Sequence, residues 1–171
     1  FGRRGTHISR PMMHTGWTSG APVALALLWR GHEHQEEPPL LAGRAILDKI
    51  AEERTPHGLF WPEWIEDEGW NTGLNPEETW IHTRTLADAV LHTIRALRLE
   101  LLHNQSHPQW LEAIRTNLDY VVSRQRGDGA LGTCYDCETG EVTEWEGSAG
   151  AAWIGALAAA VSLLHDSRYR E

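Results

Sequence analysis

The sequence lacks any apolar run long enough to cross a membrane. A membrane-spanning helix needs about 20 predominantly apolar residues, and the most apolar segment, residues 149–164, contains Gly155 and Ser162. The first residues also lack the pattern of a cleavable signal peptide. We therefore expect a soluble protein without a membrane partner, and a cytoplasmic rather than a secreted location.

Basic residues are scarce too. The chain has 15 Lys and Arg against 24 Asp and Glu, for a net charge of -9, and only one of the basic residues is a lysine, Lys49. Because nucleic-acid binders present basic patches, this balance argues against a nucleic-acid partner.

Cysteine is limited to Cys134 and Cys137. A single CxxC pair cannot form a four-thiolate zinc site within this chain. His32 and His34 could supply ligands, but they lie on a short connection away from the long loops. We expect two loop thiols or a local disulfide, and neither a metal nor a cofactor.

Tryptophan, by contrast, is abundant. There are nine Trp and only two Phe, and an indole offers a flat face with one polar group. Six of the nine lie in long interhelical segments or in the first turn after them: Trp17, Trp61, Trp64, Trp70, Trp80 and Trp145.

Apolar periodicity predicts five helices. They cover residues 22–30, 40–54 and 75–102, a stretch following Pro108, and residues 148–164. The first and last are apolar on all sides, whereas the second and fourth are amphipathic, so inner and outer helices alternate. No strand-like alternation competes with this pattern. We predict an all-α fold, an (α/α) toroid of antiparallel helical hairpins, as a single segment over residues 1–171.

The connections alternate in length as well. Residues 55–77 and 126–146 are long, as is the lead-in before Pro22, and antiparallel packing places all three at the N-termini of inner helices. Long loops are often functional. Residues 56–60 echo residues 127–132, and the inner-helix starts indicate a repeating unit of about sixty residues.

Several short motifs resemble those of the six-hairpin glycosidases, particularly the unsaturated glucuronyl and rhamnogalacturonyl hydrolases. They are Pro11-Met12-Met13, Asp128-Gly129, Tyr135-Asp136 and Glu146-Gly147-Ser148-Ala149, with Trp80 to Arg84 at the expected helix start. The resemblance implies sugar hydrolysis by carboxylate acid/base catalysis on a helical barrel. It also implies that this chain is an incomplete barrel, truncated at both ends.

The chain departs from that family at one catalytic position. Those hydrolases carry an aspartate just before the Met-Met pair, and here Ser9, Arg10 and Pro11 occupy the stretch. Their remaining catalytic elements lie in hairpins that precede the region matched here. The family's chemistry therefore does not transfer directly to these residues.

Candidate site residues come from the long loops. Acidic residues are plentiful there, and Glu63, Glu66 and Glu68 fit solvated loop charges. Hydrolysis of a glycosidic bond needs two carboxylates, and the candidate catalytic residues are Glu146, Glu144, Asp136 and Asp67. The candidate substrate-binding residues are Trp17, Trp64, Trp70, Trp80, His82, Arg84 and Trp145. The structural alternatives are that the indoles pin loops to the core and that Arg84 pairs with Glu77 or Glu78.

Three functions remain open. The first is a glycoside hydrolase acting on oligosaccharides, including those that contain uronate. The second is a polysaccharide lyase or sugar epimerase, with Tyr135 or His82 as the base. The third is a non-catalytic fragment that binds sugar or a partner chain. An open ring would expose the flank of the helix at residues 149–164, so we also expect self-association or a complementary chain.

Overall fold

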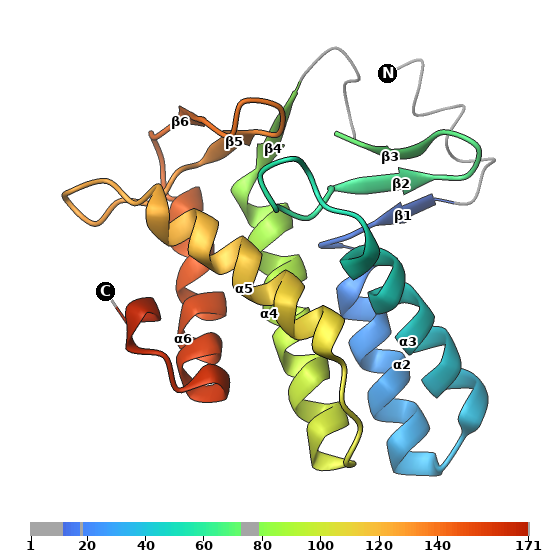
Figure 1. The fold of residues 1–171 in the computed structure, drawn as a ribbon. Coiled ribbons are helices and arrows are strands. Elements are labelled where there is room, and N and C mark those ends of the chain that lie inside the picture. The colour runs from blue at the N-terminus through green and yellow to red at the C-terminus, as the bar shows by residue number, and fades with distance from the viewer. Residues whose placement is uncertain (1–11, 18, 73–78, 171) are drawn as a thin grey trace.

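The computed structural model describes residues 12–17, 19–72 and 79–170. Its α-helices are α2 (Ala21–His34), α3 (Glu37–Glu52), α4 (Thr83–Leu102), α5 (Pro108–Ser123) and α6 (Trp153–Leu164). Two short 3-10 helices, η1 (Ala149–Ala152) and η2 (Ser167–Tyr169), flank α6. Six short strands complete the fold (Figure 1): β1 (Met12–His14), β2 (Glu63–Ile65), β3 (Gly69–Asn71), β4 (Trp80–His82), β5 (Cys134–Asp136) and β6 (Val142–Glu144).

The helices form two layers. Helix α4 packs between α2 and α6 in one layer, while α3 and α5 contact each other in the second layer and cover α2 and α4 (Figure 1). The core lies between the layers and includes the fully buried Leu28, Ile94, Trp110 and Trp153. The predicted alternation of inner and outer helices is therefore present among the described residues. However, the first and last helices are not buried on all sides, because Trp29 on α2 is 58% exposed and Ile154 on α6 is 64% exposed.

The prediction of an all-α fold is wrong. The six strands form two antiparallel three-stranded sheets, in the orders β1-β2-β3 and β4-β5-β6, so the fold is mixed α and β. Each strand has only three residues, too few to produce a recognisable two-residue alternation. Each sheet also joins a strand before one helical hairpin to a pair of strands after it, which local sequence does not indicate.

The start of the third helix differs from the prediction for the same reason. Residues 80–82 form β4, and α4 begins only at Thr83. His82 is the N-cap residue, and its Nδ1 accepts a hydrogen bond of 3.3 Å from the Arg84 N–H. The predicted cap at residues 75–78 lies outside the described residues.

Two consecutive units of the chain, β1 to β3 and β4 to β6, are built alike. In each unit a strand is followed by an inner helix and an outer helix, and then by a two-stranded hairpin that pairs with the first strand. Thr15, directly after β1, donates its N–H to the Pro62 carbonyl at 2.9 Å. Thr83, directly after β4, donates its N–H to the Thr133 carbonyl at the same distance. The inner helices α2 and α4 begin at Ala21 and Thr83, which agrees with the predicted unit of about sixty residues.

The echo between residues 56–60 and 127–132 is confirmed as structural equivalence. Gly58 donates its N–H to the Thr55 carbonyl, and Gly129 donates its N–H to the Arg126 carbonyl, both at 2.8 Å. Their φ angles are 86° and 85°, a conformation that glycine adopts at little cost. The same turn thus ends both outer helices.

Both sheets lie at one end of the helical layers, above the N-termini of α2 and α4 (Figure 1). The prediction that the long connections share one face is therefore confirmed for the described residues. The opposite end carries the short connections between α2 and α3 and between α4 and α5.

Candidate functional site at the N-terminus of α4

Five of the predicted site residues lie around the N-terminus of α4: Trp17, Trp80, His82, Arg84 and Glu144. We call them the α4 cluster. Strand β4 places Trp80 and His82 on the outer face of the second sheet, because Ile81 between them is buried in the core. The indole of Trp80 is 40% exposed.

Strand register brings the second sheet's polar residues together. His82 pairs with Cys134, and Cys134 pairs with Glu144, so the three side chains lie along one rung of the sheet. An open hollow of about 420 Å³ lies here, lined by Trp80, His82, Cys134, Thr143 and Glu144. It combines one aromatic face with several hydrogen-bonding groups.

Cys134 holds Glu144 in place within the hollow. Its Sγ lies 3.6 Å from a carboxylate oxygen of Glu144. Burial raises the pKa of the Cys134 thiol to about 11, and the neighbouring Glu144 carboxylate adds to the effect. The thiol is thus protonated at neutral pH and serves as a donor rather than as a nucleophile.

Cys137 does not bond to Cys134. Both cysteines are buried and free, so of the two expected states, thiols or a local disulfide, the structure has the thiols. Burial also raises the pKa of Cys137 to about 11. Its N–H donates to the Thr79 carbonyl at 2.8 Å, which fixes the start of β4 against the turn after β5.

Asp136 shapes the β5–β6 hairpin. Its carboxylate accepts the N–H groups of Glu138 at 2.9 Å and Thr139 at 2.7 Å. The Thr79 hydroxyl donates to the other carboxylate oxygen. Although burial raises the pKa of Asp136, these hydrogen bonds outweigh it and lower the pKa overall. Asp136 is therefore a stable anion occupied by the turn, which makes it a poor proton donor.

Trp17 reaches the α4 cluster from the first sheet. Its turn touches the first turn of α4, because a Cβ atom on Gly16 would overlap the backbone carbonyl of Thr85. The indole stacks on the imidazole of His14, with ring centroids 4.5 Å apart and planes 21° apart. Trp17 is nevertheless 46% exposed.

Arg84 pairs within its own helix. Its guanidinium lies 3.6 Å from the carboxylate of Asp88, one turn further along α4, and the side chain remains largely exposed. The alternative partners Glu77 and Glu78 lie outside the described residues. Because the first turn of α4 contains no acidic residue, the positive end of the helix dipole and the Arg84 charge lie in the same region.

The other predicted site residues lie elsewhere. Trp64 and Trp70 pack against the core on the inner face of the first sheet, and the Lys49 ammonium lies 5.9 Å from the Trp64 ring centroid. Asp67 occupies the exposed β2–β3 turn with a φ of 68°. Half-buried Trp145 lies beneath the Arg126 guanidinium, 5.2 Å from its ring centroid. Exposed Glu146 contributes its backbone carbonyl to the Thr133 hydroxyl at 3.0 Å.

The sequence analysis did not predict the position of Glu63, which it interpreted as a solvated loop charge. It pairs with His14 on one side and Asn71 on the other, and it is only 5% exposed. Burial lowers the pKa of His14, so this imidazole is neutral at pH 7. No local signal separates Glu63 from Glu66 or Glu68, because only strand pairing places it beside His14.

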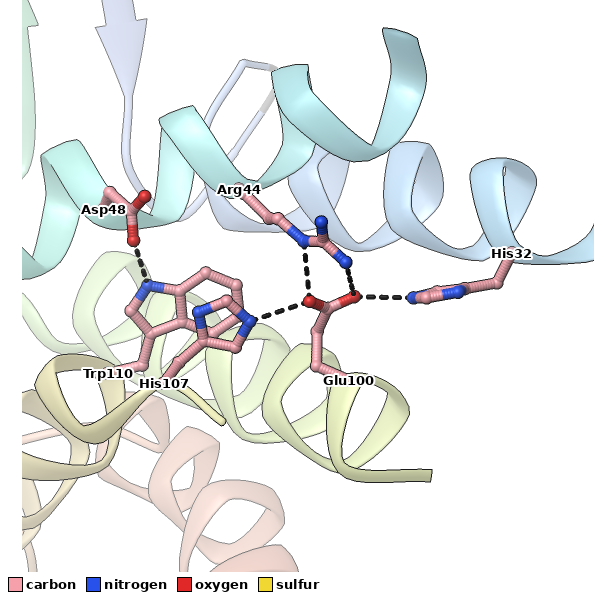
Figure 2. A network of polar contacts seen from close by, with 6 residues as sticks. All are labelled: His32, Arg44, Asp48, Glu100, His107 and Trp110. Carbon is pink, nitrogen blue, oxygen red and sulfur yellow. Dashed lines mark hydrogen bonds and ion pairs between the residues drawn. The ribbon is translucent and has the colours of Figure 1, made fainter. Parts of the chain in front are cut away.

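A second polar cluster lies at the opposite end of the helices (Figure 2). The fully buried carboxylate of Glu100 accepts hydrogen bonds from His32 at 2.5 Å, from Arg44 at 2.8 and 3.3 Å, and from His107 at 2.7 Å. Burial raises the pKa of Glu100, but these bonds outweigh it and lower the pKa to about 2. We call these four residues the Glu100 network.

The Glu100 network is a structural element. Its members come from α2, α3, α4 and the N-cap of α5, and His107 stacks on Trp110, whose Nε1–H donates to Asp48 at 2.7 Å (Figure 2). With the Arg44 guanidinium bonded to Glu100, the carboxylate is already satisfied. Among the described residues no group of His, Cys, Asp or Glu has a geometry suited to a metal ion.

Comparisons with known proteins give no information about this site. Neither models of protein families nor curated protein sequences gave a match to this chain. Within the part of the chain that the structure describes, no helix is long and apolar enough to cross a membrane.

Proposed function

We propose that the chain binds oligosaccharides at the α4 cluster and acts as a glycoside hydrolase, or as part of one. The observation that carries the proposal is the open hollow beside Trp80, in which an exposed indole, an imidazole and a carboxylate surround one space. The motif resemblance to six-hairpin glycosidases supports the same class.

The chemistry of the hollow suits a sugar ring. A pyranose presents an apolar C–H face that buries well against an indole. Its hydroxyl groups need both donors and acceptors, which His82 and Glu144 supply. Binding sites for small molecules typically combine such apolar surface with a few placed polar groups.

Glu144 is the carboxylate that we expect to act on the glycosidic bond. It lines the hollow and is oriented by the Cys134 thiol. Asp136, on the same face, is occupied by the hairpin turn. Hydrolysis needs a second carboxylate across the bond, and Glu146, exposed two residues further on, is the nearest candidate in sequence.

A uronate-containing ligand fits the charges at the N-terminus of α4. Arg84 is largely exposed, and its ion pair with Asp88 is long. A guanidinium can bind a carboxylate through two parallel hydrogen bonds, and the helix dipole adds a favourable field for an anion. We therefore expect uronate oligosaccharides to bind more tightly than neutral ones of equal length.

A lyase or epimerase is the second candidate function, and the exposure of His82 favours it. Both reactions need a base that removes a proton from a sugar carbon. Tyr135, the other candidate base, is fully buried in the core, and burial raises the pKa of its hydroxyl to about 12. His82 is therefore the only one of the two candidate bases that faces the hollow.

Calorimetric titration with uronate and neutral oligosaccharides tests the binding. We expect Trp80→Ala to weaken binding at least tenfold and Trp29→Ala to leave it unchanged, because Trp29 is an exposed indole on α2 outside the cluster. Equal losses in both variants, or none in either, would remove the α4 cluster as the site.

Product analysis separates the two reactions. Both reactions release a new reducing end, but only a lyase also leaves a carbon–carbon double bond that absorbs ultraviolet light. New reducing ends without that absorbance, abolished by Glu144→Gln, indicate a hydrolase, whereas the absorbance, abolished by His82→Ala, indicates a lyase. Sugar binding without any turnover would leave a non-catalytic binding protein.

A further inference from the structure

The internal repeat makes β1 and β2 of the first sheet equivalent in register to β4 and β5 of the second sheet. Thr15 and Thr83 make the same backbone bond, and their hydroxyls donate to equivalent carbonyls, Trp61 at 2.7 Å and Gly132 at 2.5 Å. The preceding residues, His14 and His82, therefore occupy the same position in the two sheets. If His82 contacts a sugar, the equivalent position of the first sheet is the place to look for a second contact.

An exposed indole lies beside that position, in the turn that follows β1. The His14 imidazole stacks on the Trp17 indole, with the planes 21° apart, and Trp17 remains 46% exposed. Because burial lowers the pKa of His14, the supporting ring is uncharged at neutral pH. The indole is thus held in one orientation without a charge beside it.

The turn that carries Trp17 packs against the first turn of α4, which directly follows the strand that carries Trp80. Gly16, next to Trp17, lies against the backbone of Thr85, and Thr85 is one residue from Arg84 in the first turn of α4. A side chain at position 16 would separate these segments. The second indole, Trp80, immediately precedes α4 in β4.

We propose that the ligand is an extended, linear oligosaccharide that lies across both sheets, with one sugar unit on Trp17 and another on Trp80. This inference rests on the proposed function and specifies its substrate class: a polymer or long oligomer rather than a mono- or disaccharide. His14 is a positioning residue that fixes the plane of the Trp17 indole.

Chain-length dependence of binding tests the proposal. Calorimetry with defined galacturonate oligomers from two to six units, and with cello-oligomers of the same lengths, should show affinity rising at least tenfold from dimer to hexamer for one of the series. In Trp17→Ala this rise should disappear while dimer affinity stays unchanged, because the dimer occupies Trp80 alone. Trp80→Ala should weaken binding at every length.

Further variants separate positioning from folding. Trp17→Phe keeps an aromatic face and should retain part of the rise, and His14→Phe should retain more of it than His14→Ala because a phenyl ring can still stack on the indole. Melting curves of all variants give the control for folding. Binding that is independent of length in the wild-type chain, or a rise that persists in Trp17→Ala, would overturn the extended ligand but not the sugar site. Absence of binding at all lengths in both series would overturn the proposed function together with this inference.

Discussion

The polar side chains at the two ends of the helical layers differ in burial and in hydrogen bonding. At the end without sheets, the Glu100 carboxylate is fully buried and accepts four hydrogen bonds, so no capacity remains for a ligand. At the end with sheets, His82, Arg84 and Glu144 are exposed, and each makes few or long contacts. The buried, fully hydrogen-bonded Glu100 carboxylate holds the helical hairpins together. The exposed side chains at the other end make few hydrogen bonds within the protein and can therefore bind a ligand.

The largest expected effect is on stability, at the Glu100 network. Glu100→Gln removes the negative charge and leaves the Arg44 guanidinium without its buried partner. Breaking such a pair costs about 3–5 kcal/mol, and we expect that loss in the free energy of unfolding measured with urea. Glu112→Gln, an exposed carboxylate on α5, is the matched control. Sugar affinity of the folded Glu100→Gln protein should be unchanged, and a parallel loss of affinity would contradict the division between the two ends.

Acid should lower the free energy of unfolding by protonating Glu100. The pKa of Glu100 is lowered to about 2 from an ordinary value near 4.5. A carboxyl group with a lowered pKa stabilises the fold fully above its unfolded-state pKa, and this contribution is lost as pH falls through the folded-state value. We therefore expect stability to decrease between about pH 4.5 and pH 2. Urea titrations across this range should give a smaller decrease for Glu100→Gln, and identical slopes would show that the network does not carry the effect.

Alanine substitutions in the equivalent turns of the two repeats should have an intermediate effect on stability. Both Gly58 and Gly129 have positive φ, so replacement by alanine costs about 1 kcal/mol at either position. A Cβ at Gly58 would also overlap the side chain of Thr116, whereas at Gly129 it would meet only Gln125 at 3.9 Å. We expect Gly58→Ala to destabilise more than Gly129→Ala. Adding Thr116→Ala should remove the difference in melting temperature, and if it persists the overlap is not its cause.

The smallest expected change in stability is at the α4 cluster. Trp80 is an exposed side chain on a strand, and surface substitutions usually change stability by less than about 0.5 kcal/mol. Trp80→Ala should therefore melt close to the wild-type chain while losing sugar affinity. A large drop in melting temperature would mean that Trp80 serves the fold, as Trp64 and Trp70 do through their packing against the core.

The free flank of α6 bears on the expected self-association, which remains a prediction. Ile154 is 64% exposed, and a cavity of about 470 Å³ lined partly by Ile154, Leu157 and Ala158 lies beside it. Apolar surface of this kind marks interaction sites in many proteins. The mass of the chain in solution, measured by light scattering at several concentrations, decides between a monomer and an assembly.

Local sequence was sufficient to predict the helices. The periodicity of Leu86, Val90 and Ile94 reports burial of one helix face, and Gly58 and Gly129 each indicate a turn, because these preferences act over a few residues. The segment from Trp80 to Arg84 was expected at a helix start, and α4 begins within it at Thr83. Local sequence did not reveal that residues 80–82 form a strand, since three residues contain too little pattern and their partners are more than fifty positions away.

What the sequence determined by itself is the alternation of helices between the inner and the outer layer and the gathering of long, tryptophan-rich connections at one end. Only the tertiary structure decided which of those residues meet. Strand register placed His82 and Glu144 on either side of Cys134 and Glu63 beside His14, and packing against the core left Trp64 and Trp70 only partly exposed. The physical reason is that helix periodicity arises from contacts three and four residues apart, whereas a rung of a sheet joins backbone groups that lie more than fifty residues apart in the chain.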